Sequence, residues 1–163
     1  ISLKDIKGKK VILNIFPSID TPVCSMSVRK FNEEITKFPN TEVICVSMDL
    51  PFAHSRFCET EGIKNVISAS ELRNRDFGND YGIRISEGPL SGLLARSILI
   101  LDENSKVLFS KIVPELTEEP DYEEVLGLLN GTGQDDDHCV QTSTAEHARS
   151  GNEDDACDDG RAG

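Results

Sequence analysis

Short apolar runs that alternate with longer amphipathic stretches most strongly constrain what this chain can fold into. Residues 9–16, 41–48 and 65–68 are short and rich in Val and Ile, which is typical of buried strands. Between them, residues 25–38 repeat apolar side chains at helical spacing. Residues 51–62 begin with Pro and end with Gly, as helices often do. The first half of the chain is therefore predicted as β-α-β-α-β.

The second half continues this alternation and closes with a hairpin. A helix is predicted to start near Ser70 and to end at about residue 82. Two apolar runs, residues 95–101 and 106–113, are joined by four residues and predict a β-hairpin. Residues 121–130 then predict a last amphipathic helix. The order β-α-β-α-β-α-β-β-α predicts a thioredoxin-like α/β fold, with a central mixed sheet and helices on both faces.

Composition divides the 163 residues into two unequal parts. Residues 1–130 contain every Phe and Tyr of the chain. Residues 131–163 carry nine acidic residues against two arginines, and so contribute −7 of the formal net charge of −12. Such a segment cannot bury enough apolar surface to offset its ordering entropy. We therefore predict one folded domain over residues 1–130 and a disordered acidic tail over residues 131–163.

Charge and cysteine content exclude several classes of protein. The chain has no basic stripe, so nucleic acid is not an expected partner. No apolar run reaches the roughly 20 residues that span a bilayer, and no secretory signal is visible. The five cysteines are widely spaced, without Cys-x-x-Cys, which argues against a secreted disulfide scaffold. We expect a cytoplasmic protein with one or two reactive thiols and no membrane partner.

Cys24 is the cysteine for which reactivity is most strongly predicted. It follows a buried strand and a loop, and it stands in the first turn of a helix. Unsatisfied N–H groups and the positive end of the helix dipole stabilise a thiolate at such a position. Thr21 lies three residues earlier, where its hydroxyl could donate to the thiolate or to a substrate oxygen, and Pro17 could shield the sulfur from water. The spacing Pro17-x-x-x-Thr21-x-x-Cys24 after a hydrophobic strand indicates an active-site loop.

Four stretches resemble the peroxiredoxins, specifically their bacterial thiol peroxidase subfamily. The active-site segment of that subfamily is similar to NIFPSIDTPVCSMSVRKFNEE, and its second helix, with a resolving cysteine, is similar to SMDLPFAHSRFCETEGIKNV. Its later part is similar to YGIRISEGPLSGLLARSILILDEN and EEPDYEEVL. The likeness covers residues 1–130 and implies an atypical two-cysteine peroxiredoxin. The implied site consists of the peroxidatic Cys24, the resolving Cys58, and Thr21, Pro17 and Arg96, which complete the peroxide site.

The resemblance implies a thioredoxin-dependent peroxidase. Hydrogen peroxide or an organic hydroperoxide would oxidise Cys24 to a sulfenic acid, which condenses with Cys58 to a disulfide that thioredoxin reduces. Neither a metal nor another cofactor is implied, and homodimers are common in the family. Cysteines on separate helices rarely have Cα atoms within the roughly 7 Å that a disulfide needs. We therefore expect local unwinding of one or both helix starts between the reduced and oxidised states.

The chain departs from the family at both ends. The family normally begins with a β-hairpin and a further strand before the region that opens this chain, and the acidic segment after residue 130 has no counterpart. We therefore expect exposed apolar surface on the sheet, and an inactive truncated fragment is one alternative. A thioredoxin-like thiol–disulfide oxidoreductase is another, although the helix start lacks Cys-x-x-Cys. Cys45, in the apolar run VICV, is interpreted as a structural residue.

Overall fold

A five-stranded mixed sheet forms the centre of the computed structural model, which describes residues 1–2, 4–115 and 117–131. The strand order is β3-β2-β1-β4-β5. The central strand β1 is parallel to β2 and antiparallel to β4. At the two edges, β3 pairs parallel to β2 and β5 pairs antiparallel to β4. The strands are β1 (Lys10–Ile15), β2 (Thr41–Ser47), β3 (Val66–Ser70), β4 (Ser97–Leu101) and β5 (Val107–Ile112).

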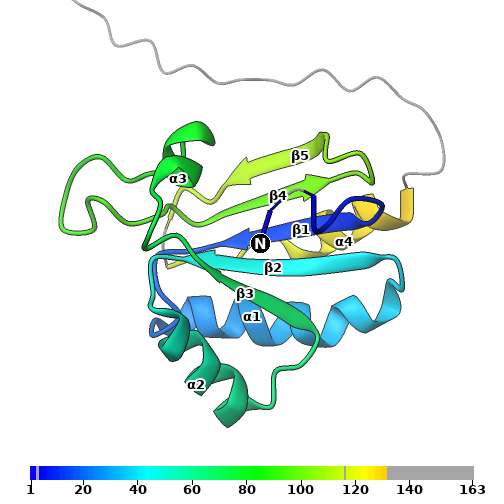
Figure 1. Ribbon diagram of the computed structural model, residues 1–163, viewed down its shortest axis with the longest axis horizontal. Coiled ribbons are helices and arrows are strands. Elements are labelled where there is room, and N and C mark those ends of the chain that lie inside the picture. The colour runs from blue at the N-terminus through cyan, green and yellow to red at the C-terminus, as the bar shows by residue number, and fades with distance from the viewer. Residues whose placement is uncertain (3, 116, 132–163) are drawn as a thin grey trace, which may run out of the picture. The chain divides into compact units, whose positions relative to one another are not determined.

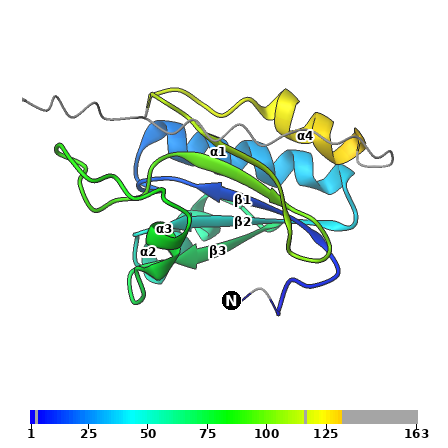
Figure 2. The same ribbon diagram turned by 90° about the horizontal axis from the view of Figure 1, so that it is seen from above.

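Helices cover both faces of this sheet. Two of them, α1 and α4, lie on one face, and α3 lies on the other together with the first residues of the chain (Figures 1 and 2). This arrangement confirms the predicted thioredoxin-like α/β fold. The helices are α1 (Pro22–Glu34), extended by the 3₁₀ turn η1 (Ile35–Lys37), then α2 (Pro51–Glu61), α3 (Asp76–Asp80) and α4 (Tyr122–Gly131).

Side chains of the central strand alternate between two hydrophobic cores. Ile12 belongs to the core that contains Cys24 and Phe31 of α1 and Val125 of α4. Leu13, its neighbour in sequence, belongs to the core on the opposite face. Because successive strand residues point to opposite faces, and both faces are covered, the strand is a continuous apolar run rather than an alternating one. The same arrangement places Cys24 inside the larger core.

Two helix boundaries differ from the sequence prediction. The predicted helix start near Ser70 is wrong, because Ser70 is the last residue of β3 and pairs with Ser47 of β2. Its hydroxyl also donates a hydrogen bond to the Asp49 carbonyl oxygen at 2.6 Å. Tertiary pairing therefore overrides the local helical pattern, and α3 is only five residues long. Helix α1 starts at Pro22, three residues earlier than predicted, since proline suits a first helical position.

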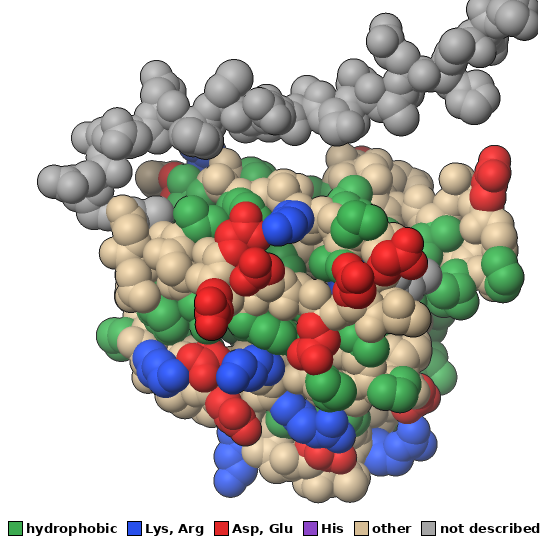
Figure 3. Space-filling view, turned by 180° about the vertical axis from the view of Figure 1, so that it is seen from behind, with side chains coloured by type: hydrophobic (Ala, Val, Ile, Leu, Met, Phe, Trp, Pro, Cys, Tyr) green, Lys and Arg blue, Asp and Glu red, His purple; other side chains and the backbone are tan. Residues whose placement is uncertain are grey.

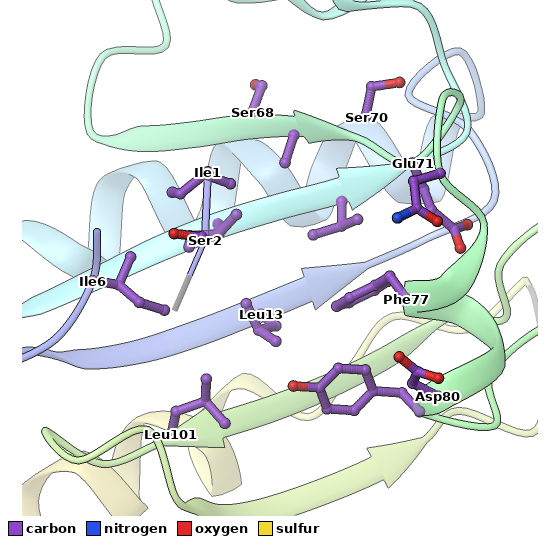
Figure 4. Close-up of a pocket in the computed structure, with 15 residues that line it drawn as sticks. Ile1, Ser2, Ile6, Leu13, Ser68, Ser70, Glu71, Phe77, Asp80 and Leu101 are labelled. Carbon is purple, nitrogen blue, oxygen red and sulfur yellow. The ribbon is translucent and has the colours of Figure 1, made fainter. Parts of the chain in front are cut away.

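The face opposite α1 has a hollow of about 760 Å³. Figure 4 shows its walls, with Leu13 from β1, Phe77 and Asp80 from α3, and Ile6 from the start of the chain. The expected exposed apolar surface lies on the edge strands, where Ile67 is 37%, Val107 44% and Ile112 49% exposed. It does not lie on the floor of this hollow, where Leu13 is 5% and Ile44 3% exposed. The acidic tail predicted for residues 131–163 lies, apart from Gly131, outside the described residues.

The face of the molecule drawn in Figure 3 has no continuous basic patch that would suit a polyanion. In Figure 3, Lys and Arg side chains are interspersed with Asp and Glu, whereas nucleic-acid binding needs a continuous basic stripe. Among the described residues, no helix combines the length and apolar character needed to cross a bilayer.

Candidate active site

Cys24 is the third residue of α1, and its side chain is fully buried. Thr21 is the N-cap of this helix, as its hydroxyl oxygen accepts a hydrogen bond from the Cys24 backbone N–H at 3.4 Å. The same hydroxyl donates to the Ser18 carbonyl oxygen at 3.2 Å. A threonine hydroxyl has a single proton. In this structure Thr21 therefore caps the helix, and its proton is not directed at the Cys24 sulfur.

Arg96 is the residue that contacts the Cys24 sulfur. Its Nη2 lies 3.3 Å from Cys24 Sγ, and the whole side chain is 1% exposed. The backbone on both sides is paired, with Ala95 N–H donating to the Ile83 carbonyl and Val113 N–H donating to the Arg96 carbonyl. A guanidinium carries a fixed positive charge, so this hydrogen bond to the sulfur is charge-assisted. Cys24 and Arg96 are thus brought together across 72 residues.

Pro17 is buried at the start of the loop that joins β1 to α1. This loop is held by Asp49, which follows β2. The Asp49 carboxylate accepts hydrogen bonds from the Ser18 hydroxyl at 2.8 Å and from the Ile19 backbone N–H at 2.7 Å. These bonds orient the segment that ends in Thr21. Shielding of the sulfur by Pro17 stays a prediction.

Cys58 lies on α2, is half-buried, and packs against the same core that contains Cys24. Its sulfur is 3.6 Å from the Ser68 hydroxyl of β3. Both cysteines are free thiols in this structure. The fold therefore brings the two predicted cysteines into one core while keeping them on separate helices.

Two buried polar residues near Cys24 were not predicted from the sequence. Ser27 donates a hydrogen bond to the Cys24 carbonyl oxygen at 2.8 Å, and Asn14 Nδ2 donates to the Ser27 hydroxyl at 3.2 Å. This chain ties the first turn of α1 to the central strand. The sequence did contain a signal for this contact, which is the single asparagine inside the apolar run KVILNIF. An amide buried in such a strand needs a hydrogen-bond partner.

Cys45 occupies the middle of β2 and is fully buried. Burial raises the pKa of its thiol to about 12, against a weaker opposing effect of the Asn14 hydrogen bond. A thiol with such a pKa stays protonated near neutral pH and is a poor nucleophile. This environment agrees with the interpretation of Cys45 as a structural residue.

The hollow in Figure 4 is not the site of this chemistry. Its lining includes none of Cys24, Thr21 and Arg96.

Comparison with known proteins gives the family. The sequence profile described as Redoxin matches residues 1–126. The chain belongs to the redoxin family. A thiol peroxidase from Corynebacterium glutamicum is 53% identical over 130 residues, which cover 80% of this chain and 78% of that protein.

Solved structures agree with this assignment. A peroxiredoxin-like protein from Aquifex aeolicus is 46% identical with a TM-score of 0.73, and the match covers 76% of this chain and 72% of that one. The thiol peroxidase from Chromobacterium violaceum has the same TM-score of 0.73 at 24% identity, covering 80% and 75% of the two chains, and supports the fold alone. The resemblance to peroxiredoxins is confirmed, and with it the prediction of an oxidoreductase of the peroxidase class.

Proposed function

We propose that this redoxin reduces hydroperoxides with Cys24 and then closes a disulfide to Cys58. One observation carries the proposal, which is the Arg96 guanidinium 3.3 Å from the sulfur of a buried cysteine at a helix start. Two sources of positive potential, the guanidinium and the helix N-terminus, converge on that sulfur. They stabilise the thiolate before the reaction and the oxyanion that forms during it.

The first step is attack of the Cys24 thiolate on the outer oxygen of the peroxide. The O–O bond breaks, Cys24 becomes a sulfenic acid, and the remaining RO⁻ takes a proton and leaves as ROH. Arg96 lies where it can donate to the leaving oxygen. Thr21 would donate to the peroxide after its proton turns away from the Ser18 carbonyl.

The second step joins Cys58 to the oxidised Cys24. The Cys58 thiolate attacks the sulfenic sulfur, the S–S bond forms, and the hydroxyl group leaves as water after taking up a proton. Both cysteines lie on ordered helices, so this step requires local unwinding. Helix α2 is the better candidate to unwind, because His54 is its only buried residue and its N-cap Leu50 makes no side-chain capping bond.

The cycle closes when thioredoxin reduces the disulfide by thiol–disulfide exchange. We place this cycle in the cytoplasm, in a homodimer, as the resemblance to the bacterial thiol peroxidases implies. Hydrogen peroxide and organic hydroperoxides are both proposed as substrates.

Peroxide turnover by cysteine variants of the full chain tests this function. Cys24→Ser should abolish peroxide consumption, whereas Cys58→Ser should complete one turnover and then stop. Cys45→Ser is the matched control and should behave as the unsubstituted protein, with peptide mapping showing a Cys24–Cys58 disulfide. Equal slow loss of all thiols would contradict the proposal, and exchange with protein disulfides without peroxide would favour a thiol–disulfide oxidoreductase.

A further inference from the structure

Asp49 joins the β1–α1 loop to the end of β2 through its carboxylate. Besides Ser18 and Ile19 of the β1–α1 loop, it accepts a hydrogen bond from the Ser47 hydroxyl of β2 at 2.6 Å. Both carboxylate oxygens therefore have partners, and the side chain is half-buried. The loop that leads to Thr21 is fastened to the end of β2 through this one group.

The hydroxyl of Ser47 extends the network to helix α2. Ser47 Oγ lies 2.9 Å from His54 Nε2, and His54 is the fourth residue of α2 with only 2% of its surface exposed. Because an ionised carboxylate only accepts, the single proton of Ser47 goes to Asp49. Ser47 Oγ must then accept from His54 Nε2–H. Burial lowers the pKa of His54, against the opposing charge of Asp49, which agrees with a neutral ring protonated at Nε2.

This array is not a hydrolase triad, although it contains Ser, His and Asp. In a triad, histidine takes the serine proton and the acid orients the histidine. Here the serine donates to the acid and is fully buried, so it presents no nucleophile. The array is instead a hydrogen-bond chain that runs from α2, through β2, to the β1–α1 loop.

One end of this hydrogen-bond chain is the loop that leads to Cys24, and the other end is the helix that carries Cys58. The loop ends at Thr21, which caps the helix start at Cys24. Helix α2 carries Cys58 one turn after His54. Displacing either the loop or the first turn of α2 breaks at least one hydrogen bond of the chain, and a broken bond leaves a buried polar group unsatisfied.

We propose that Ser47, Asp49 and His54 form a latch that positions Cys24 for attack on peroxide and must open before Cys58 can reach it. The inference rests on the proposed two-cysteine reaction. These are positioning residues, since none of them contacts the Cys24 sulfur. Asp49 favours the first chemical step because it orients the loop, and the whole latch restrains the second. Loss of Asp49 should therefore slow the first step and speed the second, whereas loss of His54 should speed only the second.

A second link between the same segments serves as the control. Arg56 of α2 and Asp20 of the loop lie 4.0 Å apart, with side chains 73% and 71% exposed. An exposed pair of this kind contributes little. Asp20→Asn removes a carboxylate from the same loop without touching the latch.

Three substitutions in the latch and one control substitution separate the latch from general destabilisation. Asp49→Asn should slow oxidation of Cys24 by roughly tenfold, because the loop loses its orientation, and should speed disulfide formation several-fold. His54→Leu frees only α2, so oxidation of Cys24 should stay within about twofold while disulfide formation accelerates. His54→Gln keeps an N–H donor toward Ser47 and should restore the rates of the unsubstituted protein, and Asp20→Asn should match them.

The experiment is rapid-quench oxidation of the reduced full-length protein with hydrogen peroxide, in which mass spectrometry follows the sulfenic acid and the disulfide separately. Opposite changes in the two rates for Asp49→Asn, with rescue by His54→Gln, support the latch. Parallel slowing of both steps, or equal rates in His54→Leu and His54→Gln, overturns it.

Amide hydrogen exchange of the reduced variants tests the latch without peroxide. Asp49→Asn should speed exchange in residues 17–21 and in the first turns of α2 together. Faster exchange in the loop alone overturns the coupling, whether or not the protein reacts with peroxide. If the unsubstituted protein fails to react while this coupling is observed, the proposed function fails and the mechanical link between the segments stands.

Discussion

Helices α1 and α2 each carry one of the two cysteines, and they are held very differently. Helix α1 has a threonine cap and four buried residues, and its cysteine is fully buried. Helix α2 has no side-chain cap and one buried residue, and its cysteine is half-buried. The first helix is therefore held by capping and by core packing, whereas the second is fastened at a few points. This difference suits the proposed reaction, in which α2 would unwind and α1 would support the peroxidatic sulfur.

The points that fasten α2 are identifiable. Near its C-terminus, Arg29 of α1 donates to Glu61 at 2.8 Å and lies 5.6 Å from the centre of the Phe57 ring. Just beyond it, the Asn32 side chain accepts from the backbone N–H groups of residues 64 and 65. His54 fastens the first turn. In the proposed reaction, the more firmly held helix would therefore carry the cysteine that reacts with peroxide, and the less firmly held helix the cysteine that forms the disulfide.

Truncating one aromatic residue in each helix should give the largest contrast in stability. Phe31 of α1 is fully buried, whereas Phe57 of α2 is partly buried. Phe31→Ala should lower the free energy of unfolding by about 3–5 kcal/mol, and Phe57→Ala by about 1–2 kcal/mol, since less apolar surface is lost. Urea denaturation measures both. Equal losses would show that α2 is packed as firmly as α1.

Removing the charge of Arg96 should affect the oxidation of Cys24 much more than the formation of the disulfide with Cys58. Arg96 contacts the Cys24 sulfur, so Arg96→Gln should slow oxidation of Cys24 by roughly 100- to 1000-fold. Disulfide formation from the sulfenic acid should change much less, because that step depends on the movement of α2. Single-turnover kinetics resolves the two steps. A similar loss in both would mean that Arg96 acts on the fold rather than on the first reaction.

Adding a side-chain cap to α2, or removing the cap of α1, should narrow the difference in local stability between the two helices. Leu50→Ser gives α2 the side-chain cap that it lacks and should stabilise the protein by about 0.5–1 kcal/mol while slowing disulfide formation. Thr21→Val removes the cap of α1 and should cost about 1 kcal/mol. Thermal unfolding gives the stabilities, and quench kinetics gives the disulfide rate. Faster disulfide formation in Leu50→Ser would contradict the assignment of α2 as the yielding helix.

His54 should give the smallest effect, a dependence of stability on pH. Burial lowers its pKa below the ordinary 6.5, so the unfolded chain binds a proton at a pH where the folded chain does not. The contribution is complete above about pH 6.5 and declines as the pH falls toward the folded-state pKa. The loss of stability between pH 7.5 and about pH 5.5 should therefore be smaller in His54→Gln. An unchanged loss would show that His54 ionises equally in both states.

The sequence predicted those parts of the fold and site that depend on local pattern. The helix start at Cys24 follows from a strand, a proline-containing loop and an amphipathic stretch in immediate succession. Gly62 was predicted to end α2, and it does so in the left-handed conformation with φ 67°. Arg96 was assigned only through the resemblance to a family, because a contact across 72 residues leaves no local signal.

The parts that could not be predicted depend on which strands become neighbours. Asp49 meets Ser18 only because β1 and β2 pair in parallel, so that the residues after both strands lie at one edge of the sheet. Ser70 joined a strand rather than a helix for the same reason, since its partner in β2 is distant in sequence. The direction of the Thr21 proton depends on the turn at Ser18, which side-chain spacing does not specify.

Amide hydrogen exchange, compared between the fully reduced protein and its peroxide-generated disulfide form, tests the unequal roles of the two helices most directly. We predict that residues 51–61 lose protection in the disulfide form, while residues 27–34 of α1, beyond its first turn, keep theirs. Equal protection of both helices in the two forms would contradict it, and so would loss of protection throughout α1 with α2 intact.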